Sequence, residues 1–226
     1  IINQFVNKKL PYDTANDFAP VTKLIDNVGV FITVHPSVPV NSVKEFIAYA
    51  RNPANKLAYS TPGIGNTMHI ATELFNAKYG TQMVHVPYKA GAQAVLDMAS
   101  GRLTAVVTIL TPLVPQAKAG KLKVLAVLGR RSDLMPDVPS VSERVPGFET
   151  PPSWQGYWAP GGTPAAVIER LHQAVAKVLA DDGLRQQLAA RGAEAAPTTP
   201  DGLRQFVRTE MERWGQAVKR SGTTVD

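Results

Sequence analysis

The amino-acid sequence predicts an α/β fold, in which short strands alternate with helices along the chain. Short apolar segments rich in β-branched residues recur between residues 28 and 128, and segments with apolar residues at helical spacing lie between them. The short connections are typical of a mainly parallel sheet with helices on its faces. With 226 residues, 44% of them hydrophobic and 19% charged, the chain is large enough for one large domain or two smaller lobes.

The expected strands are short apolar runs. The run at 28–34, Val-Gly-Val-Phe-Ile-Thr-Val, is uninterrupted, as expected of a strand covered on both faces. Similar runs predict further strands at 57–60, 83–86, 103–107, 122–128 and 157–159.

The expected helices lie between these strands and have recognisable ends. Ser42 is a suitable N-cap for the first of them. Gly80 can end the second, because glycine readily adopts the left-handed conformation that terminates helices. The periodicity predicts helices at 43–50, 66–79, 92–99 and 112–119.

Two longer amphipathic helices are expected in the C-terminal part of the chain. Thr163 and Thr199 are each followed by proline, so each is expected to be an N-cap with proline at the first helical position. The apolar residues that follow at intervals of three and four are 167, 168, 171, 175, 178 and 179 in one helix, and 203, 207, 211, 214 and 218 in the other. The material between 34 and 124 already forms its own unit, so these helices are expected to cover a sheet begun elsewhere.

The composition of the chain changes after residue 135. Residues 136–152 are rich in proline and have little periodicity, as is typical of a connection between two lobes. The sequence begins at Ile1 without a methionine, so we expect it to be a portion of something longer.

Composition and motifs argue against several function classes. The net charge of +6 is spread along the chain and mixed with acidic residues, so no nucleic-acid partner is expected. Cysteine is absent, no apolar run is long enough to cross a bilayer, and no secretion signal is visible. No histidine pair has metal-binding helical spacing, and no Gly-x-Ser-x-Gly elbow occurs. We therefore expect no enzyme, no metal and no cofactor.

The most informative segment is 59–69, Tyr-Ser-Thr-Pro-Gly-Ile-Gly-Asn-Thr-Met-His. A strand that passes through a glycine loop (residues 62–66) into a helix start directs free backbone N–H groups and a positive dipole end at one point. Such a site binds a carboxylate or a phosphate, although the same sequence suits an ordinary turn that needs glycine. It is neither a Walker loop nor a dinucleotide-binding loop. The candidate ligand-binding residues are Ser60, Thr61, Gly63, Gly65, Asn66, Thr67 and His69.

His69 has two interpretations, because it lies in the first turn of this helix. It either contacts the ligand or forms a hydrogen bond with its own loop. Further candidates are Thr108, at the end of the strand at 103–107, and Trp154, just before the last strand. Segment 84–92 also runs from strand to helix start. The carboxyl ends of parallel strands meet at one edge of a sheet, where ligands bind, so we expect these segments to come together. Trp154 as core filler and Thr108 as a core-facing residue are the alternatives.

The order of the motifs carries a family resemblance over the whole chain. Residues 8–13 and 17–21, the glycine loop with His69, and residues 84–89, 118–122, 134–141 and 159–164 occur in the order typical of one family. The sequence resembles the tripartite tricarboxylate transporter receptors, the TctC or Bug family of extracytoplasmic solute-binding proteins.

The resemblance implies a type II periplasmic-binding-protein fold, the Venus flytrap, with two α/β lobes joined by two crossing strands. Residues 36–148 would form a complete second lobe, and 1–35 with 149–226 a partial first lobe that lacks its N-terminal part. The implied function is capture of a small carboxylate for the membrane subunits of a tripartite tricarboxylate-type transporter. A periplasmic location, a secretion signal outside this chain and a monomeric state follow from the same resemblance.

Two departures from the family pattern bear on the ligand. The first strand and glycine loop that normally grip the ligand from the first lobe are missing from this sequence. Many relatives carry aspartate at the position of Thr108, which would suit an amine. We therefore expect a carboxylate without an amine, namely a di- or tricarboxylate or an aromatic acid. The alternative function is the effector-sensing domain of a LysR-type transcription regulator, which shares the flytrap fold.

Overall fold

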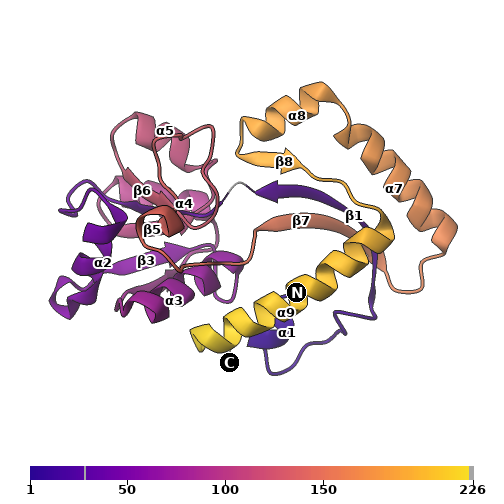
Figure 1. Ribbon diagram of the computed structural model, residues 1–226, viewed down its shortest axis with the longest axis horizontal. Helices are drawn as coiled ribbons and strands as arrows, with labels where there is room; N and C mark the ends of the chain where they lie inside the picture. Colours follow the sequence, from indigo (N-terminus) through magenta and orange to yellow (C-terminus); the bar gives the residue numbers. More distant parts are fainter. Residues whose placement is uncertain (28, 224–226) are drawn as a thin grey trace.

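The computed structural model describes residues 1–27 and 29–223, and contains two separate sheets joined by the chain (Figure 1). The five-stranded sheet has the order β4-β3-β5-β2-β6, and the three-stranded sheet has the order β7-β1-β8. The chain passes from one sheet to the other between the end of β1 and the start of β2, and returns before β7. The α/β class expected from the sequence is confirmed.

The five-stranded sheet is built from β2 (Phe31–Val34), β3 (Ala58–Thr61), β4 (Val84–Pro87), β5 (Ala105–Thr108) and β6 (Lys123–Val127). Strand β3 is parallel to β4 and β5, whereas β2 is antiparallel to both of its neighbours, β5 and β6. The expectation of a mainly parallel sheet therefore holds except for β2, which enters from the other sheet and runs against the rest.

Strand β2 is shorter than the expected run at 28–34. All four of its residues are buried, as expected of a strand covered on both faces. Gly29 and Val30 lie outside it, and Val28 lies outside the described residues. A Cβ at Gly29 would lie 2.3 Å from Val127 Cγ2, so glycine is required for the chain to pass β6 this closely. The continuous strand was wrong because the chain changes sheets here.

The helices of this unit are α2 (Val43–Arg51), α3 (Thr67–Tyr79), α4 (Gly91–Ala99), α5 (Leu113–Lys118) and α6 (Val141–Arg144), with a 3-10 turn at Pro53–Asn55. Ser42 caps α2 as expected, by accepting a hydrogen bond from Glu45 N at 3.2 Å. Gly80 ends α3 with φ +63°. The segment 136–152 is more than a connection, because Val141 and Phe148 are buried in the core of this unit.

The three-stranded sheet has β1 (Phe18–Asn27) at its centre, between β7 (Trp154–Pro160) and β8 (Ala193–Ala195). The sequence did not predict β1 or β8. Both pairings of β1 are antiparallel, and the register of β1 with β7 shifts next to Pro20. Proline within a strand is tolerated at such an irregularity, and this proline obscured the strand signal in the sequence.

Four helices accompany this sheet, namely α1 (Asn3–Val6), α7 (Ala165–Leu179), α8 (Asp182–Ala189) and α9 (Pro200–Ser221). Thr199 caps α9 as expected, by accepting a hydrogen bond from Gly202 N at 3.0 Å. The same expectation was wrong for Thr163, because Pro164 occupies the N-cap of α7 in an extended conformation. The Thr163 hydroxyl instead donates to Pro160 O at 2.7 Å.

The apolar stripes of the two long helices differ in how far they are buried. In α9, Leu203, Val207, Trp214 and Val218 are buried. Trp214, Ala217 and Val218 pack with Ile70 of α3, so α9 reaches from the three-stranded sheet to the other unit (Figure 1). In α7, Ile168 is buried against Val21, whereas Val167, Leu171 and Val178 are exposed. Within the described residues, no helix is both long enough and apolar enough to cross a membrane.

Candidate functional site

The glycine loop connects β3 to α3 in the geometry that the sequence predicts. Gly63 and Gly65 have φ of +122° and +72°, conformations that disfavour other residues. Asn66 is the N-cap of α3, and its Oδ1 accepts hydrogen bonds from Met68 N at 2.8 Å and His69 N at 2.9 Å. Its Nδ2 donates to Gly63 O at 2.8 Å. One side chain therefore fixes both the loop and the start of the helix.

Further side chains hold the loop from behind. The Thr61 hydroxyl lies 3.0 Å from Gly63 O and 2.8 Å from His85 Nε2. His69 is buried, and its Nδ1 accepts a hydrogen bond from Gly65 N at 3.1 Å. Of the two interpretations of His69, the structure shows the hydrogen bond with its own loop.

These contacts leave two backbone donors for an anion. Among the described hydrogen bonds, none comes from the backbone N–H of Asn66 or Thr67. Both lie at the start of a helix of 13 residues, where free N–H groups and the helix dipole favour a negative charge. The Gly65 N–H, which the sequence suggested as a third donor, is directed at His69 instead. The loop can thus offer an anion two N–H groups and the Thr67 hydroxyl.

The loop opens into a cavity of about 530 Å³, which lies between the glycine loop and the face formed by β7, α9 and the N-terminal segment. Gly65, Asn66 and Thr67 line it from one side, and Trp154 lines it from the other. Four candidate residues from distant parts of the sequence therefore share one cavity. The sequence did not single out the other aromatic residues of its wall as ligand-binding, although each lies within a motif, strand or helix that it predicted: Tyr12, Phe18, Trp158 and Trp214.

Trp154 is held in this wall by its neighbours. Its ring meets Phe206 of α9 edge-on, with centroids 5.0 Å apart. On the same helix, Glu210 is fully buried and accepts a hydrogen bond from Arg213 at 3.0 Å. Burial raises the pKa of Glu210, and Arg213 opposes that shift. The side chains of Trp154 and Trp214 also hydrogen-bond the Glu210 carboxylate, so the two tryptophans of the cavity wall rest on a buried acidic group of α9.

The other candidates lie beside the loop and do not line this cavity. Ser60 and Thr108 are buried, and Ser60 Oγ has no hydrogen-bond partner among the described residues. A Cβ at Gly91 would lie 2.8 Å from Thr108 Oγ1, so Thr108 faces the start of α4. Thr61, Gly63 and His69 support the loop through the contacts given above.

The electrostatic environment behind the loop favours neutral imidazoles. Burial, and to a smaller extent the nearby His69, lower the pKa of His85 to about 4. Burial also lowers the pKa of His69, against the opposing charge of Glu73. The Tyr59 hydroxyl donates to Glu73 at 2.5 Å, and burial raises its pKa. No group of histidine and acidic residues among those described could hold a metal ion.

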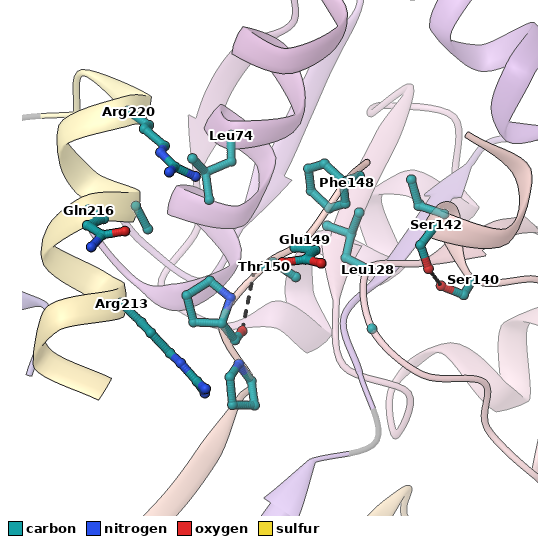
Figure 2. A pocket seen from close by; sticks show the side chains of 15 residues that line it. Leu74, Leu128, Ser140, Ser142, Phe148, Glu149, Thr150, Arg213, Gln216 and Arg220 are labelled. Carbon is teal, nitrogen blue, oxygen red and sulfur yellow. Dashed lines mark hydrogen bonds between the residues drawn. The ribbon is translucent and has the colours of Figure 1, made fainter. Parts of the chain in front are cut away.

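A second cavity, of about 490 Å³, lies between α9 and the segment that returns to the three-stranded sheet (Figure 2). Arg213, Gln216 and Arg220 of α9 line one side, and Ser140 and Ser142 lie across from them. None of the candidate residues lines this cavity.

Comparison with known proteins places the chain in a family. A sequence profile of the tripartite tricarboxylate transporter family receptor matches residues 2–223. The chain belongs to this family. BugT of Bordetella pertussis is 29% identical over 215 residues, which are 94% of this chain and 65% of BugT. A UPF0065 protein of Bordetella bronchiseptica is 32% identical over 197 residues, which are 87% of this chain and 58% of that protein. The chain thus spans about two thirds or less of these relatives.

Solved structures of receptor proteins agree with the family assignment. Rpa4515 of R. palustris, solved with adipate, has a TM-score of 0.90 at 34% identity, over 99% of this chain and 75% of its own. The periplasmic binding protein BugD has a TM-score of 0.89 at 27% identity, over 99% and 75%. MatC of Rhodopseudomonas palustris, with bound malate, has a TM-score of 0.82 at 28% identity, over 93% and 72%. The fold is therefore that of a periplasmic binding protein, with two α/β lobes joined by crossing segments.

Proposed function

We propose that the protein is an extracytoplasmic receptor that captures a small carboxylate between two lobes for a tripartite tricarboxylate-type transporter. The observation that carries this proposal is the pair of free N–H groups at Asn66 and Thr67, on residues that line a cavity between the glycine loop and the three-stranded sheet. The family and the adipate and malate complexes of two relatives support it. The role is binding without catalysis, in the periplasm and as a monomer.

The lobes are proposed to be residues 36–148, and residues 1–35 together with 149–226. The five-stranded sheet with β3 to β6 falls in the first of these, and the three-stranded sheet falls in the second. Strand β2, at the boundary, belongs by its pairing to the five-stranded sheet. The two connections between the sheets would then act as the hinge.

The candidate residues divide into two roles. Gly65, Asn66, Thr67 and Trp154 are proposed to contact the ligand, because they line the cavity. Thr61, Gly63 and His69 are proposed to support that contact by fixing the loop. One carboxylate would receive hydrogen bonds from the Asn66 and Thr67 N–H groups, and each such charge-assisted bond contributes about 1.5–3 kcal/mol.

A second helix start favours a ligand with two carboxylates. The N-cap of α4 is Ala90, which has no side chain to cap the helix, and no described hydrogen bond comes from the N–H of Gly91 or Ala92. Strands β3 and β4 are parallel neighbours, so α3 and α4 begin at the same edge of the sheet. Ser60 and Thr108 bring neutral hydroxyls to this region, which suits a carboxylate and gives an amine no ionic partner.

A ligand screen tests the proposed function. The protein, with any residues that precede Ile1 in its gene, is heated with adipate, malate, succinate, citrate or benzoate, and in parallel with aspartate and glutamate. We expect carboxylates without an amine to raise the unfolding temperature most, because a ligand that binds only the folded state stabilises it. Preferential stabilisation by amino acids would overturn the ligand class. No stabilisation by any of these acids would overturn the receptor function.

A further inference from the structure

Three aromatic rings form a stack directly behind the glycine loop. The ring centroids of His69 and His85 are 4.0 Å apart, and those of His85 and Tyr59 are 4.9 Å apart. The stack follows from the pairing of β3 with β4, which sets Tyr59 opposite His85, while α3 brings His69 onto the same face. His69 comes from the helix that the loop begins, so the stack is a fixed base for the loop.

The hydrogen bonds fix the proton positions in this stack. His69 Nδ1 accepts from Gly65 N, so this nitrogen must be unprotonated. The Thr61 hydroxyl has one proton, and its geometry allows donation to Gly63 O. His85 Nε2 then donates to Thr61 Oγ1 at 2.8 Å. Both sides of the loop, at Gly63 and at Gly65, are therefore held by bonds that lead back to neutral histidines.

We infer that His69 is a positioning residue for the ligand, which holds the Asn66 and Thr67 N–H groups in their binding orientation only while its imidazole is neutral. This inference rests on the proposed function of the glycine loop. Gly65 precedes the two free donors directly, and as a glycine it has little conformational restriction of its own, so its path depends on the contacts that it makes. The hydrogen bond to His69 Nδ1 secures that path at the residue next to the binding donors.

Protonation of His69 removes this support. A protonated imidazole donates from both nitrogens, so Nδ1–H would face the Gly65 N–H, and two donors would oppose each other. The loop would then have to move at Gly65, and the donors of Asn66 and Thr67 would move with it. Ligand affinity should accordingly fall in acid.

The groups that face His69 determine the pH at which its imidazole becomes protonated. Burial favours the neutral form of His69, whereas Glu73 on the same helix favours the charged one, and His85 of β4 stacks on the His69 ring. The Tyr59 hydroxyl on β3 donates a hydrogen bond to Oε1 of the Glu73 carboxylate. Helix α9 also packs on α3, and it contributes the apolar residues Trp214, Ala217 and Val218 to that contact. Burial is the larger influence and lowers the pKa of His69, so the neutral form prevails at pH 7.

The first experiment needs no ligand. Amide NMR spectra of the protein are recorded between pH 8 and pH 5, together with those of His69→Asn and His69→Leu. Asparagine keeps an acceptor close to the Nδ1 position but does not titrate, whereas leucine removes the acceptor. We expect the Gly65 amide resonance to follow the His69 titration in the natural protein. It should stay constant in His69→Asn and be displaced at every pH in His69→Leu. A Gly65 amide that is unaffected in His69→Leu would overturn the inference.

The second experiment measures binding of adipate and malate by calorimetry over the same pH range. We expect the affinity of the natural protein to fall about five- to tenfold on protonation, as expected for loss of one hydrogen bond. His69→Asn should bind with little pH dependence, and His69→Leu should bind weakly throughout. His172→Asn, on α7, is the matched control and should keep the natural pH profile. A His69→Asn profile identical to that of the natural protein would overturn the inference.

The two experiments separate this inference from the proposed function. If none of the acids of the ligand screen binds at pH 8, the proposed function fails, while the Gly65 amide still reports whether His69 holds the loop. If both acids bind and the Gly65 amide is indifferent to His69, the receptor function stands and the positioning role fails. Near-native dispersion of the other amide resonances shows that a variant is folded.

Discussion

Arg130, which follows β6 of the five-stranded sheet, forms an ion pair with Glu194 in β8 of the three-stranded sheet. Both side chains are about half exposed. Nearby, the Thr111 hydroxyl donates to Arg191 O at 2.9 Å. This edge of the molecule thus joins the two sheets through polar contacts that water can replace.

The ion pair predicts a small and salt-dependent effect on ligand affinity. Glu194→Gln should change affinity less than about fivefold, because an exposed pair contributes about 0–1 kcal/mol. The change should shrink as salt screens the pair. Glu143→Gln, which breaks an exposed pair with Arg131 within one unit, is the control and should leave affinity unaltered. Calorimetry at low and high salt checks both, and a tenfold loss in Glu194→Gln would contradict the prediction.

Thr67 is the candidate whose side chain tests direct contact. Thr67→Val keeps the shape but removes the hydroxyl, and should weaken adipate or malate binding about tenfold or more, because a hydrogen bond to a charged group contributes about 1.5–3 kcal/mol. Thr209→Val, an exposed threonine of α9, is the matched control. Equal affinities of Thr67→Val and the natural protein would remove Thr67 from the site.

Asn66 separates loop stability from ligand binding. Asn66→Ala removes the cap and the bond to Gly63, and should lower the free energy of unfolding by about 0.5–2 kcal/mol. Asn66→Asp keeps a capping oxygen but places a negative charge beside the anion site. It should therefore retain most of the stability and lose carboxylate affinity. Urea denaturation and calorimetry measure the two effects, and tight binding by Asn66→Asp would argue against an anion at this helix start.

His85 predicts how stability depends on pH. Its pKa is about 4 in the folded protein, against an ordinary value of 6.5. Between these values the unfolded chain binds more protons than the folded protein, so stability is complete above about pH 6.5 and falls as the pH decreases toward 4. Urea denaturation at several pH values should show this slope, and His85→Gln should reduce it. An unchanged slope in His85→Gln would assign the effect to other groups.

The sequence predicted the parts of this site that depend on local signals. The glycine loop, the Asn66 position and the start of α3 follow from glycine spacing and helix periodicity. Trp154 was singled out because it precedes the expected strand at 157–159, and the structure places it at the start of that strand, β7. The stack of His69 on His85 depends on the register of β3 with β4, which no local pattern reveals. The hydrogen bond from Gly65 N–H to His69 depends on the position of that ring in the stack, so the sequence did not predict it either.

The fold shows the same division. Helices with clear caps were found within one or two residues, as for α2 and α9. Strand β1 was missed because Pro20 obscures the strand signal, and it is tolerated only where the register with β7 shifts and β8 does not pair. The wrong N-cap at Thr163 has a similar cause, since Thr-Pro suits either a cap or an extended turn, and the hydrogen bond to Pro160 selects the turn.

The contact between α9 and α3 also determines how the two sheets can part. Pulling these helices apart would expose Ile70, Trp214 and Val218 to water, at a cost of about 25 cal/mol for each Å² of apolar surface. The opposite edge, with Arg130 and Glu194, would give up an exposed ion pair, which costs little in water. We therefore expect the two lobes to separate first at the edge of β8 and to stay in contact where α9 packs on α3. Helix α3 would stay packed against α9 while the two lobes separate. Its N-terminal end, the proposed anion site, would therefore keep its shape in the open and the closed state.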